Sequence, residues 1–441
     1  MWNSPRMTST FRLNLGATLV LLALLAPAFA EPSSMSELTN RAVKIDSELR
    51  GKVLPYWFDT AQDKTNGGYL LADDAVKGRT MPSEKQIVSQ ARMVWTFSHA
   101  HLKGYSDASR NYLAAAAQGH RFLERRFLDP VDGGYYWKTD LKGNPTDDRK
   151  VLYGESFIVY ALVEYHRASG NREALRQAMD LYRLIQAKGH DAKNGGWFEH
   201  FTRDWKPLLA PYPGSEVEVP GYKSANAHLH WMEALAELYD VTKDADVKRS
   251  LEESVRINAT YFYPMNAGQS CFHRQLDWKP VTDPKSAGLS YGHNVEFAWL
   301  MVRAEKVLGK EPSWTHFDAH LQHALKYGYD HQRGGLYDRG VGDLPATKTD
   351  KVWWVQSEMM AALSDALVHQ GNPAYARALD QLIDFVWTYQ VDPRDGIWLD
   401  TVTAEGKPKS PGKAHAWKAN YHDVRGMVKF VEAFRPAPAA R

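Results

Sequence analysis

A segment near residue 290 combines side chains that can transfer protons with a large aromatic surface. In Ser290–Leu300, S-Y-G-H-N-V-E-F-A-W-L, a helix that begins at Gly292 places His293, Glu296 and Trp299 on one face at three-residue spacing. A neutral imidazole suits acid–base chemistry near neutral pH, and a neighbouring carboxylate can orient it. A buried helix with one satisfied histidine would show the same pattern, so the remaining segments must decide.

Two earlier segments add a permanent cation and a phenol. Arg92 shares a helical face with Trp95 in Q-A-R-M-V-W, and a guanidinium among apolar neighbours requires an anion or several oxygen atoms. A structural ion pair is an equally good explanation for Arg92. Tyr153 and Glu155 stand at the start of another helical segment, Y-G-E-S-F, where capping alone explains the carboxylate.

A third segment, Asn226–Glu233, carries an H-x-H motif. On a helix the side chains of His228 and His230 diverge by about 200°, so only one of them can face a shared cleft. His230 and Glu233 repeat the i,i+3 spacing of the first segment, which selects His230. The chain has no H-E-x-x-H motif and a single cysteine, Cys271, so the sequence predicts no metal site and no intramolecular disulfide.

Two segments near the C-terminus continue the pattern. W-W-V-Q-S-E places Trp354 and Glu358 at i,i+4 spacing, and Trp417 stands five residues before His422 in W-K-A-N-Y-H. Each segment alone is a weak signal. Together the five segments supply histidines, carboxylates, one arginine and tryptophans, which favours a shared site over coincidence.

These segments belong to a six-fold repeat. Helix-period stretches alternate with turns of the general type Asn/Asp/Arg-Gly-Gly-aromatic, roughly 65 residues apart, which is long enough for two helices per repeat. Paired glycines tolerate positive φ and suit a tight hairpin. The five turns and one degenerate version occupy Asn66–Tyr69, Asp132–Tyr135, Asn194–Trp197, Arg333–Leu336, Asp395–Trp398 and Asn266–Gly268.

Apolar residues at helical spacing predict the helices between these turns. Short strand signals follow the glycine pairs, as in Tyr135–Trp137 and Trp197–Phe198. The clearest helical stretches are Ser89–His101, Gly154–Arg167, Asn226–Tyr239, Trp353–Val368 and His415–Phe434.

Six helical hairpins on one period predict an all-α fold, an (α/α)6 barrel (toroid) with short β-hairpin turns gathered at one end. An open solenoid is the alternative, but the absence of a polar capping repeat favours a closed ring. No linker-like stretch interrupts the repeats, so we expect residues 31–441 to form a single catalytic domain. Inner-helix side chains would then line a central cleft.

The first 30 residues are predicted to be a signal peptide. Arg6 and Arg12 precede the apolar run Leu15–Leu25, and A-P-A-F-A ends at Ala30. The mature protein would be periplasmic or secreted, with no later segment apolar enough to cross a membrane. Cleavage removes both charges of the formal net charge of +2, and a neutral chain gives no reason to expect nucleic acid or an anionic membrane as a partner.

The aromatic composition indicates the class of ligand. The chain has 15 Trp, 22 Tyr and 16 Phe, together 12% of its residues, and sugar C–H faces pack well on such rings. Packing between helices accounts for many of these aromatics as well. A small-molecule sugar is therefore the expected partner, with the protein a monomer or a homodimer.

With these motifs the chain resembles the N-acylglucosamine 2-epimerase superfamily, and within it the cellobiose 2-epimerases most closely. The resemblance covers nearly all of the chain after the signal peptide. It rests on Tyr291–Trp299, Tyr153–Leu162, Asn226–Glu233, Trp353–Glu358 and Trp417–His422.

The resemblance implies an (α/α)6 barrel that interconverts sugars at C2 without a metal or a cofactor. It implies that His293 and His422 are the acid/base pair and that His230 and Arg92 are further catalytic residues. The implied substrate-binding residues are Glu296, Glu358, Trp299, Trp354, Trp417, Asn226 and Tyr153.

Some features depart from the pattern of the cellobiose 2-epimerases. Asn294 stands where many of them have Asp, and Glu155 where many have Gln. Export is also unusual for enzymes of cytoplasmic sugar catabolism. These departures leave the preferred sugar open.

The chemistry of epimerisation agrees with this set of residues. A base must remove the weakly acidic C2 proton beside the C1 carbonyl of the opened sugar, and a second group must return a proton to the opposite face. Arg92 with His230 would stabilise the cis-enediolate formed between the two steps.

Three alternatives stay open at this point. Return of the proton to C1 gives a ketose, so an aldose–ketose isomerase such as a mannose isomerase is the nearest alternative. An exported (α/α)6 glycoside hydrolase or lyase would use Glu296 and Glu358 as its two carboxylates. A sugar-binding protein would keep the tryptophans without needing two histidines.

Overall fold

The computed structural model describes residues 35–212, 215, 217, 219–281 and 288–435. These residues belong to one compact unit, Pro32–Arg441. The predicted signal peptide, residues 1–30, lies outside the described residues. No helix within the described ranges is both long enough and apolar enough to cross a membrane.

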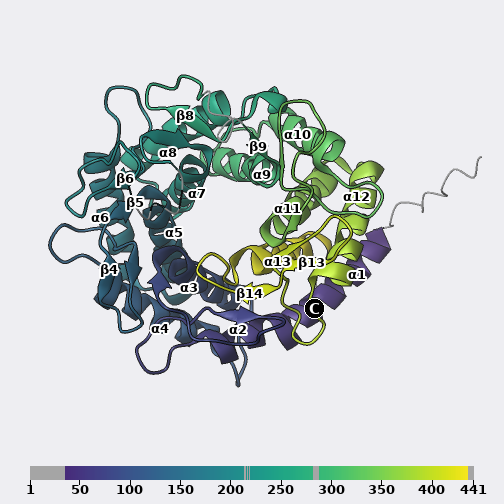
Figure 1. Cartoon of the computed structure of the whole chain (residues 1–441), viewed down its shortest axis with the longest axis horizontal. Coiled ribbons are helices and arrows are strands. Elements are labelled where there is room, and N and C mark those ends of the chain that lie inside the picture. Colours follow the sequence, from purple (N-terminus) through teal and green to yellow (C-terminus); the bar gives the residue numbers. More distant parts are fainter. Residues whose placement is uncertain (1–34, 213–214, 216, 218, 282–287, 436–441) are drawn as a thin grey trace, which may run out of the picture. The chain divides into compact units, whose positions relative to one another are not determined.

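The helices form two concentric rings (Figure 1). Each inner helix contacts the next one, and α13 also contacts α3, which closes the inner ring. The predicted (α/α)6 barrel is therefore confirmed. The inner helices are α3 (Ile87–Leu102), α5 (Leu152–Ser169), α7 (Ala225–Thr242), α9 (Tyr291–Val307), α11 (Trp353–Gln370) and α13 (Tyr421–Phe434).

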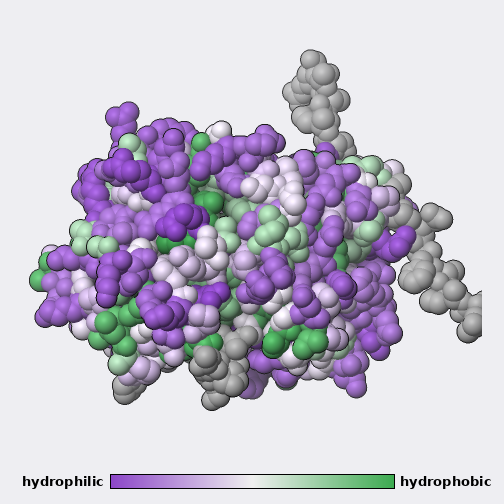
Figure 2. Space-filling model, turned by 90° about the horizontal axis from the view of Figure 1, so that it is seen from above, coloured by the Kyte–Doolittle hydropathy of each residue, from purple (hydrophilic) through white to green (hydrophobic). Residues whose placement is uncertain are grey.

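The outer helices are amphipathic because only one of their faces meets the inner ring. In α6 the buried side chains include Ala174, Ala178, Leu181 and Ile185, spaced three or four residues apart. The opposite faces are polar, and the side of the molecule in Figure 2 is mostly hydrophilic. The outer helices are α1 (Met35–Glu48), α2 (Leu54–Ala61), α4 (Tyr112–Phe122), α6 (Arg172–Gly189), α8 (Ala245–Ile257), α10 (Trp314–His323) and α12 (Pro373–Phe385).

Short antiparallel strands gather at the N-terminal ends of the inner helices, as predicted. Each pairing joins the strand before one inner helix to the strand after the next turn. The pairs are β2 (Lys85–Gln86) with β3 (Lys138–Thr139), β5 (Lys150–Val151) with β6 (His200–Phe201), β7 (Tyr222–Ser224) with β8 (His273–Gln275), β9 (Leu289–Ser290) with β10 (Arg339–Gly340), β11 (Lys351–Val352) with β12 (Thr401–Val402), and β14 (Gly412–Ala414) with β1 (Asp73–Asp74). Two edge strands are added by β4 (Pro145–Asp147) and β13 (Pro408–Ser410).

Two strand predictions were displaced by a few residues. The aromatics of Tyr135–Trp137 and Trp197–Phe198 precede the strands, which begin at Lys138 and His200. Tyr135 and Trp197 form only single bridges, while their rings are buried. Core packing of the rings, rather than ladder pairing, therefore explains the aromatic signal.

The helix predicted over His415–Phe434 was wrong at its start, because α13 begins at Tyr421. The preceding segment, β14, pairs with β1 and closes the ring, and His415 and Lys418 then exchange backbone hydrogen bonds in a tight turn. Nothing in the local sequence opposes a helix here. Long-range strand pairing overrides helix propensity.

In several inner helices the side chain of the fourth residue forms hydrogen bonds with the backbone of a glycine turn. Glu155 Oε1 accepts a hydrogen bond from the backbone N–H of Tyr135 at 2.8 Å, so it does not cap its own helix as expected. Gln90 binds both backbone groups of Tyr69 in the same way. The degenerate turn Asn266–Gly268 instead leads into a short 3-10 helix, Ala267–Gln269.

Buried lysines fasten the same turns. Lys85 donates to Asp63 Oδ2 at 2.8 Å and to the carbonyl of Gly67 at 2.6 Å. The same lysine–aspartate pairing recurs in Lys150–Asp129, Lys223–Asp191 and Lys351–Asp330, in each case two residues before an inner helix. These anchored turns hold the inner-helix N-termini in place around the axis.

Candidate active site

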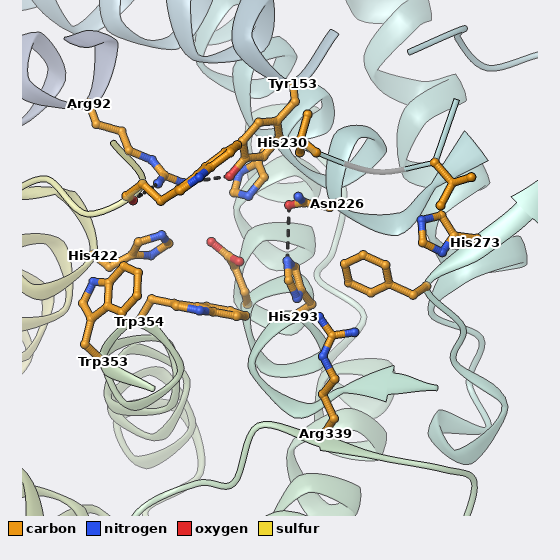
Figure 3. Close-up of a pocket in the computed structure, with 15 residues that line it drawn as sticks. Arg92, Tyr153, Asn226, His230, His273, His293, Arg339, Trp353, Trp354 and His422 are labelled. Carbon is orange, nitrogen blue, oxygen red and sulfur yellow. Dashed lines mark hydrogen bonds between the residues drawn. The ribbon is translucent and has the colours of Figure 1, made fainter. Parts of the chain in front are cut away.

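A cavity of about 460 Å³ lies at the N-terminal end of the inner ring (Figure 3). Its volume is in the range of about 300–1,000 Å³ typical of small-molecule sites. Nine of the eleven predicted site residues line it: Arg92, Tyr153, Asn226, His230, His293, Glu296, Trp354, Trp417 and His422. The sequence reasoning missed Val217, Val219, Phe272, His273, Arg339 and Trp353, which also line it.

The repeat explains why such distant residues meet. Arg92, His230 and Glu296 are each the sixth residue of an inner helix, α3, α7 and α9 respectively. Helices that start at the same height place equal positions at the same depth along the axis. His228, two residues before His230, points instead to the glycine turn and accepts from Trp197 N at 3.3 Å. The prediction that only one histidine of the H-x-H motif, His230, faces the cavity is thus confirmed.

His293 is held by two neutral partners. Its Nδ1 lies 2.9 Å from Ser290 Oγ and its Nε2 lies 3.2 Å from Asn226 Oδ1. Burial lowers the pKa of His293 well below its usual value, and the positive charge of Arg339 acts in the same direction. The ring is therefore neutral near pH 7 and available as a base.

His422 is held by a carboxylate. Its Nδ1 lies 2.7 Å from Glu358 Oε1, which leaves Nε2 for the cavity. Burial lowers the pKa of His422 to about 3. Burial opposes ionisation of Glu358 as well, but the Arg425 guanidinium and the bond from His422 lower the pKa of Glu358 to about 2. An anionic Glu358 can stabilise His422 whenever it carries a second proton.

His230 is oriented in the same manner by Glu233. His230 Nδ1 lies 2.9 Å from Glu233 Oε2, and burial lowers the pKa of His230. The imidazole ring packs against Phe157 and Tyr153, with ring centroids 4.9 and 5.3 Å away. His230 thus also presents a neutral ring to the cavity.

Arg425 connects the carboxylates beneath the cavity and was not predicted. Its Nη1 donates to Glu233 at 2.5 Å, and its Nη2 donates to Glu296 and Glu358, both at 2.7 Å. Burial and the nearby Glu358 raise the pKa of Glu296 well above its usual value, which favours the protonated form of this carboxyl group. The sequence did hold a signal: an arginine three residues, about one helical turn, after His422.

The same cluster contains the most metal-like geometry of the described residues. One ligand atom each from Glu296, Glu358 and His422 lies within 4.8 Å of the other two. The guanidinium of Arg425 already supplies the positive charge that two of these carboxyl groups bind. The donor set is therefore explained by an arginine rather than by a metal ion.

Arg92, on α3, also lines the cavity. It donates to the carbonyl of Trp417 at 3.1 Å and to the hydroxyl of Tyr153 at 2.9 Å. Among the described residues no carboxylate lies within ion-pairing distance of Arg92, unlike the hub formed by Arg425. Its charge is thus available to a developing oxyanion.

The remaining two predicted residues lie behind the cavity wall. Trp299 is six residues beyond His293, about 9 Å deeper along the helix axis, and its Nε1 donates to Glu358 Oε2 at 3.0 Å. Trp299 lines a second cavity of about 520 Å³, and Glu358 lines neither. Both residues therefore support His422 rather than contact a ligand in the first cavity.

The chain is similar to known proteins over most of its length. The family model for N-acylglucosamine 2-epimerase (GlcNAc 2-epimerase) matches residues 68–425. A cellobiose 2-epimerase of Bacteroides fragilis is 28% identical over 88% of this chain and 98% of its own length. A D-mannose isomerase of Marinomonas mediterranea is 26% identical over 86% of this chain and 95% of its own length.

A solved structure agrees with this similarity. The cellobiose 2-epimerase from Spirochaeta thermophila superposes with a TM-score of 0.81 at 31% identity, covering 91% of this chain and 99% of that one.

Proposed function

The chain belongs to the N-acylglucosamine 2-epimerase family and is a carbohydrate 2-epimerase, an isomerase, and we propose that it acts on the reducing end of a cellobiose- or mannobiose-type disaccharide or on an N-acylglucosamine. The match to the N-acylglucosamine 2-epimerase family and the similarity to a cellobiose 2-epimerase support this range of substrates. One observation carries the proposal: neutral His293 and carboxylate-backed His422 line a single cavity together with Arg92.

His293 is the base in this proposal. Its Nε2 faces Asn226 across the cavity, and its neutral ring can take the proton from C2 of the opened sugar. Because Asn226 Oδ1 can only accept a hydrogen bond, this contact requires a hydrogen on Nε2 of His293. For Nε2 to act as a base, the Asn226 amide must rotate or the imidazole must change tautomer when substrate binds. The electron pair left by the C2–H bond forms the C1–C2 double bond of the enediolate.

Arg92 and Glu296 stabilise the enediolate. Arg92 has hydrogen bonds to neutral oxygens only, so its charge can meet the oxyanion at O1 or O2. Glu296 Oε2 is buried without a hydrogen-bond partner among the described residues, while Oε1 accepts from Arg425. A protonated Glu296 can donate from this side to a sugar oxygen. His230 serves the same end as a neutral hydrogen-bonding group.

His422 returns the proton to the opposite face of C2. His422 is neutral in the free cavity; once the enediolate lies beside it, the enediolate charge and anionic Glu358 stabilise uptake of a proton from water on Nε2, and His422 passes this proton to C2 while His293 keeps the proton that it abstracted. Loss of the proton on His293 to water then restores both rings. Trp354 lies between the two histidines, with its ring centroid 4.6 Å from that of His293 and 5.8 Å from that of His422. The sugar ring can stack on its indole between the two imidazoles.

The carboxyl geometry argues against a glycoside hydrolase. Glu296 and Glu358 bind the same Nη2 of Arg425, so they lie side by side instead of flanking a bond. Glu358 also lacks access to the cavity. A hydrolase needs two carboxyl groups that reach the scissile bond, and the described residues do not provide this pair.

The test is incubation of the purified protein with cellobiose, mannose and N-acetylglucosamine in D2O, followed by NMR. Epimerisation places deuterium at C2 of the inverted product without creating new reducing ends. A ketose labelled at C1 would instead establish the aldose–ketose isomerase that the similarity to D-mannose isomerase keeps as second candidate. New reducing ends, or no reaction with any sugar, would contradict the proposal.

We also propose that the protein is exported to the periplasm or secreted. The support is the leader pattern of residues 1–30, which ends in A-P-A-F-A before Glu31. Cell fractionation and mass spectrometry of the N-terminus provide the test. We expect a mature chain that starts at Glu31; an intact Met1 in the cytoplasm would contradict export.

A further inference from the structure

Arg339 is a second guanidinium in the active-site cavity, and the proposed mechanism gives it no role. Strand pairing fixes its place, because Arg339 of β10 lies opposite Ser290 of β9, the residue that holds His293. Its guanidinium lies against the ring of Phe272, 5.1 Å from the centroid. In Figure 3, Arg339 lies on the side of His293 away from His422.

The charge of Arg339 is not matched by a hydrogen-bonded carboxylate. Its Nε is buried without a hydrogen-bond partner. Among the described residues the closest carboxylate oxygen is Asp338 Oδ2, 3.7 Å from Nε, which is beyond hydrogen-bonding distance. Burial also raises the pKa of Asp338, which weakens it as a counter-ion. A guanidinium cannot release its proton, and the Arg339 side chain is 39% exposed, so an oxygen atom of a ligand that enters the cavity can reach it.

The charges of the cavity lead to the same requirement. The reaction develops one negative charge, on the enediolate, and Arg92 is placed to meet it. Glu296 lines the cavity too, but its Oε1 is already bound by Arg425 Nη2 at 2.7 Å, so it does not offset the charge of Arg339. Among the described residues that line the cavity, the positive charge of Arg339 is therefore left without a negative charge from the reacting centre to pair with.

We propose that the substrate of this chain carries an oxyanion substituent, a carboxylate or a phosphate, outside the reacting C1–C2 centre, and that Arg339 pairs with it. This inference rests on the proposed 2-epimerase function and narrows its substrate class to acidic reducing saccharides. The planar fork of arginine binds a carboxylate or phosphate through two parallel hydrogen bonds. Contact with the ring of Phe272 restricts the guanidinium, which reduces the freedom lost on binding.

The experiment compares three substrates: neutral cellobiose, glucuronosyl-glucose with a carboxylate on its non-reducing ring, and glucose 6-phosphate. We expect the wild-type kcat/KM to favour one of the two anionic sugars over cellobiose, and the preferred sugar then identifies the oxyanion. Arg339→Gln should raise KM for that sugar about 10- to 100-fold, the value of a charge-assisted bidentate contact. The kcat/KM for cellobiose, which carries no oxyanion, should change by less, so the ratio of kcat/KM for the anionic sugar to kcat/KM for cellobiose should fall at least about 10-fold. Arg339→Lys keeps the charge without the fork and should lie between the two.

Arg333→Gln is the matched control, because it removes an exposed arginine that lies outside the cavity. It should leave all three substrates unaffected. Thermal unfolding of each variant establishes that the fold is retained.

Two outcomes would overturn the inference. An equal loss on all three substrates in Arg339→Gln would mean that Arg339 acts on His293 and not on the substrate. If the wild-type kcat/KM for cellobiose equals or exceeds that for both anionic sugars, the proposed selectivity for acidic saccharides is excluded. If no sugar exchanges deuterium at C2, the proposed function fails, but Arg339 is still tested by calorimetric binding of the unreactive alditol of glucuronosyl-glucose. Arg339→Gln should weaken that binding, and an unchanged affinity would exclude the contact.

Discussion

His422 and His293 line the same cavity, but only His422 has a carboxylate on its Nδ1. Glu358 Oε1 lies 2.7 Å from His422 Nδ1, whereas the Nδ1 of His293 lies 2.9 Å from the hydroxyl of Ser290. The first arrangement stabilises an imidazolium and the second a neutral ring. The two histidines are thus suited to opposite directions of proton transfer.

Removal of either histidine should therefore stop turnover. We expect His293→Gln and His422→Gln each to lower kcat by at least about 10²- to 10⁴-fold, the usual contribution of general acid–base catalysis. Glu358→Gln should lower kcat less, because it keeps the hydrogen bond but not the charge. Deuterium exchange at C2 by NMR measures all three variants. Full activity in either histidine variant would remove the acid/base assignment.

The pH dependence follows from the buried histidines. Burial lowers the pKa of His293, His230 and His422 below the usual value near 6.5, so these rings stay neutral in moderately acidic solution. The acid limb of kcat/KM should consequently lie below pH 6.5. An acid limb at or above pH 6.5 would show that the rings are not desolvated as described.

The same shifts make the fold sensitive to acid. Below pH 6.5 the unfolded chain binds protons that the folded chain refuses, so the stability contributed by these neutral rings is present above pH 6.5 and is lost as the pH falls. The midpoint temperature of thermal unfolding of the wild type should decrease as the pH is lowered below 6.5. The decrease should be smaller in His293→Gln. Calorimetry at a series of pH values checks both.

Arg425 should be essential for stability as well as for geometry. Arg425→Met leaves Glu233, Glu296 and Glu358 buried without their shared cation, which typically costs about 3–5 kcal/mol for a buried pair. Denaturant unfolding measures this loss. The matched control is Arg176→Met, whose partners are exposed on α6 and whose removal should cost at most about 1 kcal/mol. Similar losses in both variants would contradict the role of Arg425 as a hub.

The six-fold repeat made much of this site predictable from the sequence. Glycine turns marked the repeats, and equal positions on the inner helices brought Arg92, His230 and Glu296 to one depth. The start of α13 was not predictable, because it depends on pairing between β14 and β1 across the whole chain. Arg339 was missed for a similar reason: its strand faces Ser290, 49 positions earlier, and no local motif marks it.

Depth along the axis was the other limit of sequence reasoning. Trp299 was assigned to the face of His293, but six residues turn its side chain by about 120° relative to His293 and place it about 9 Å further along α9, where it lines the second cavity. A helical-face argument fixes direction but not depth, so it cannot separate a residue that contacts substrate from one that supports a catalytic group.

This placement separates two tryptophans experimentally. Trp299→Phe keeps an aromatic ring but loses the hydrogen bond to Glu358, so we expect kcat to fall while KM stays nearly constant. Trp417→Ala removes part of the cavity wall and should chiefly raise KM. Steady-state kinetics on one sugar distinguishes the two. A raised KM in Trp299→Phe, with kcat unchanged, would mean that this residue contacts substrate after all.

Glu155 offers a test of the fold that is independent of catalysis. It holds the turn at Tyr135 where Gln90 holds Tyr69, and burial raises the pKa of Glu155 to about 8. A carboxyl group with a raised pKa binds a proton when the chain folds, so its contribution to stability declines as the pH rises from about 4.5 to about 8. Glu155→Gln removes this proton linkage while keeping an acceptor for the turn.

The variant should thus gain stability over the parent by about 1.4 kcal/mol for each pH unit across that interval. The free energy of unfolding measured at pH 5 and pH 8 gives the two differences to compare. Gln90→Glu makes the reverse exchange on α3 and should lose stability over the same range, because its carboxyl group would be equally buried. If the gain of Glu155→Gln were the same at both pH values, Glu155 would have to be ionised in the folded protein, and the neutral hydrogen bond to the turn would be wrong.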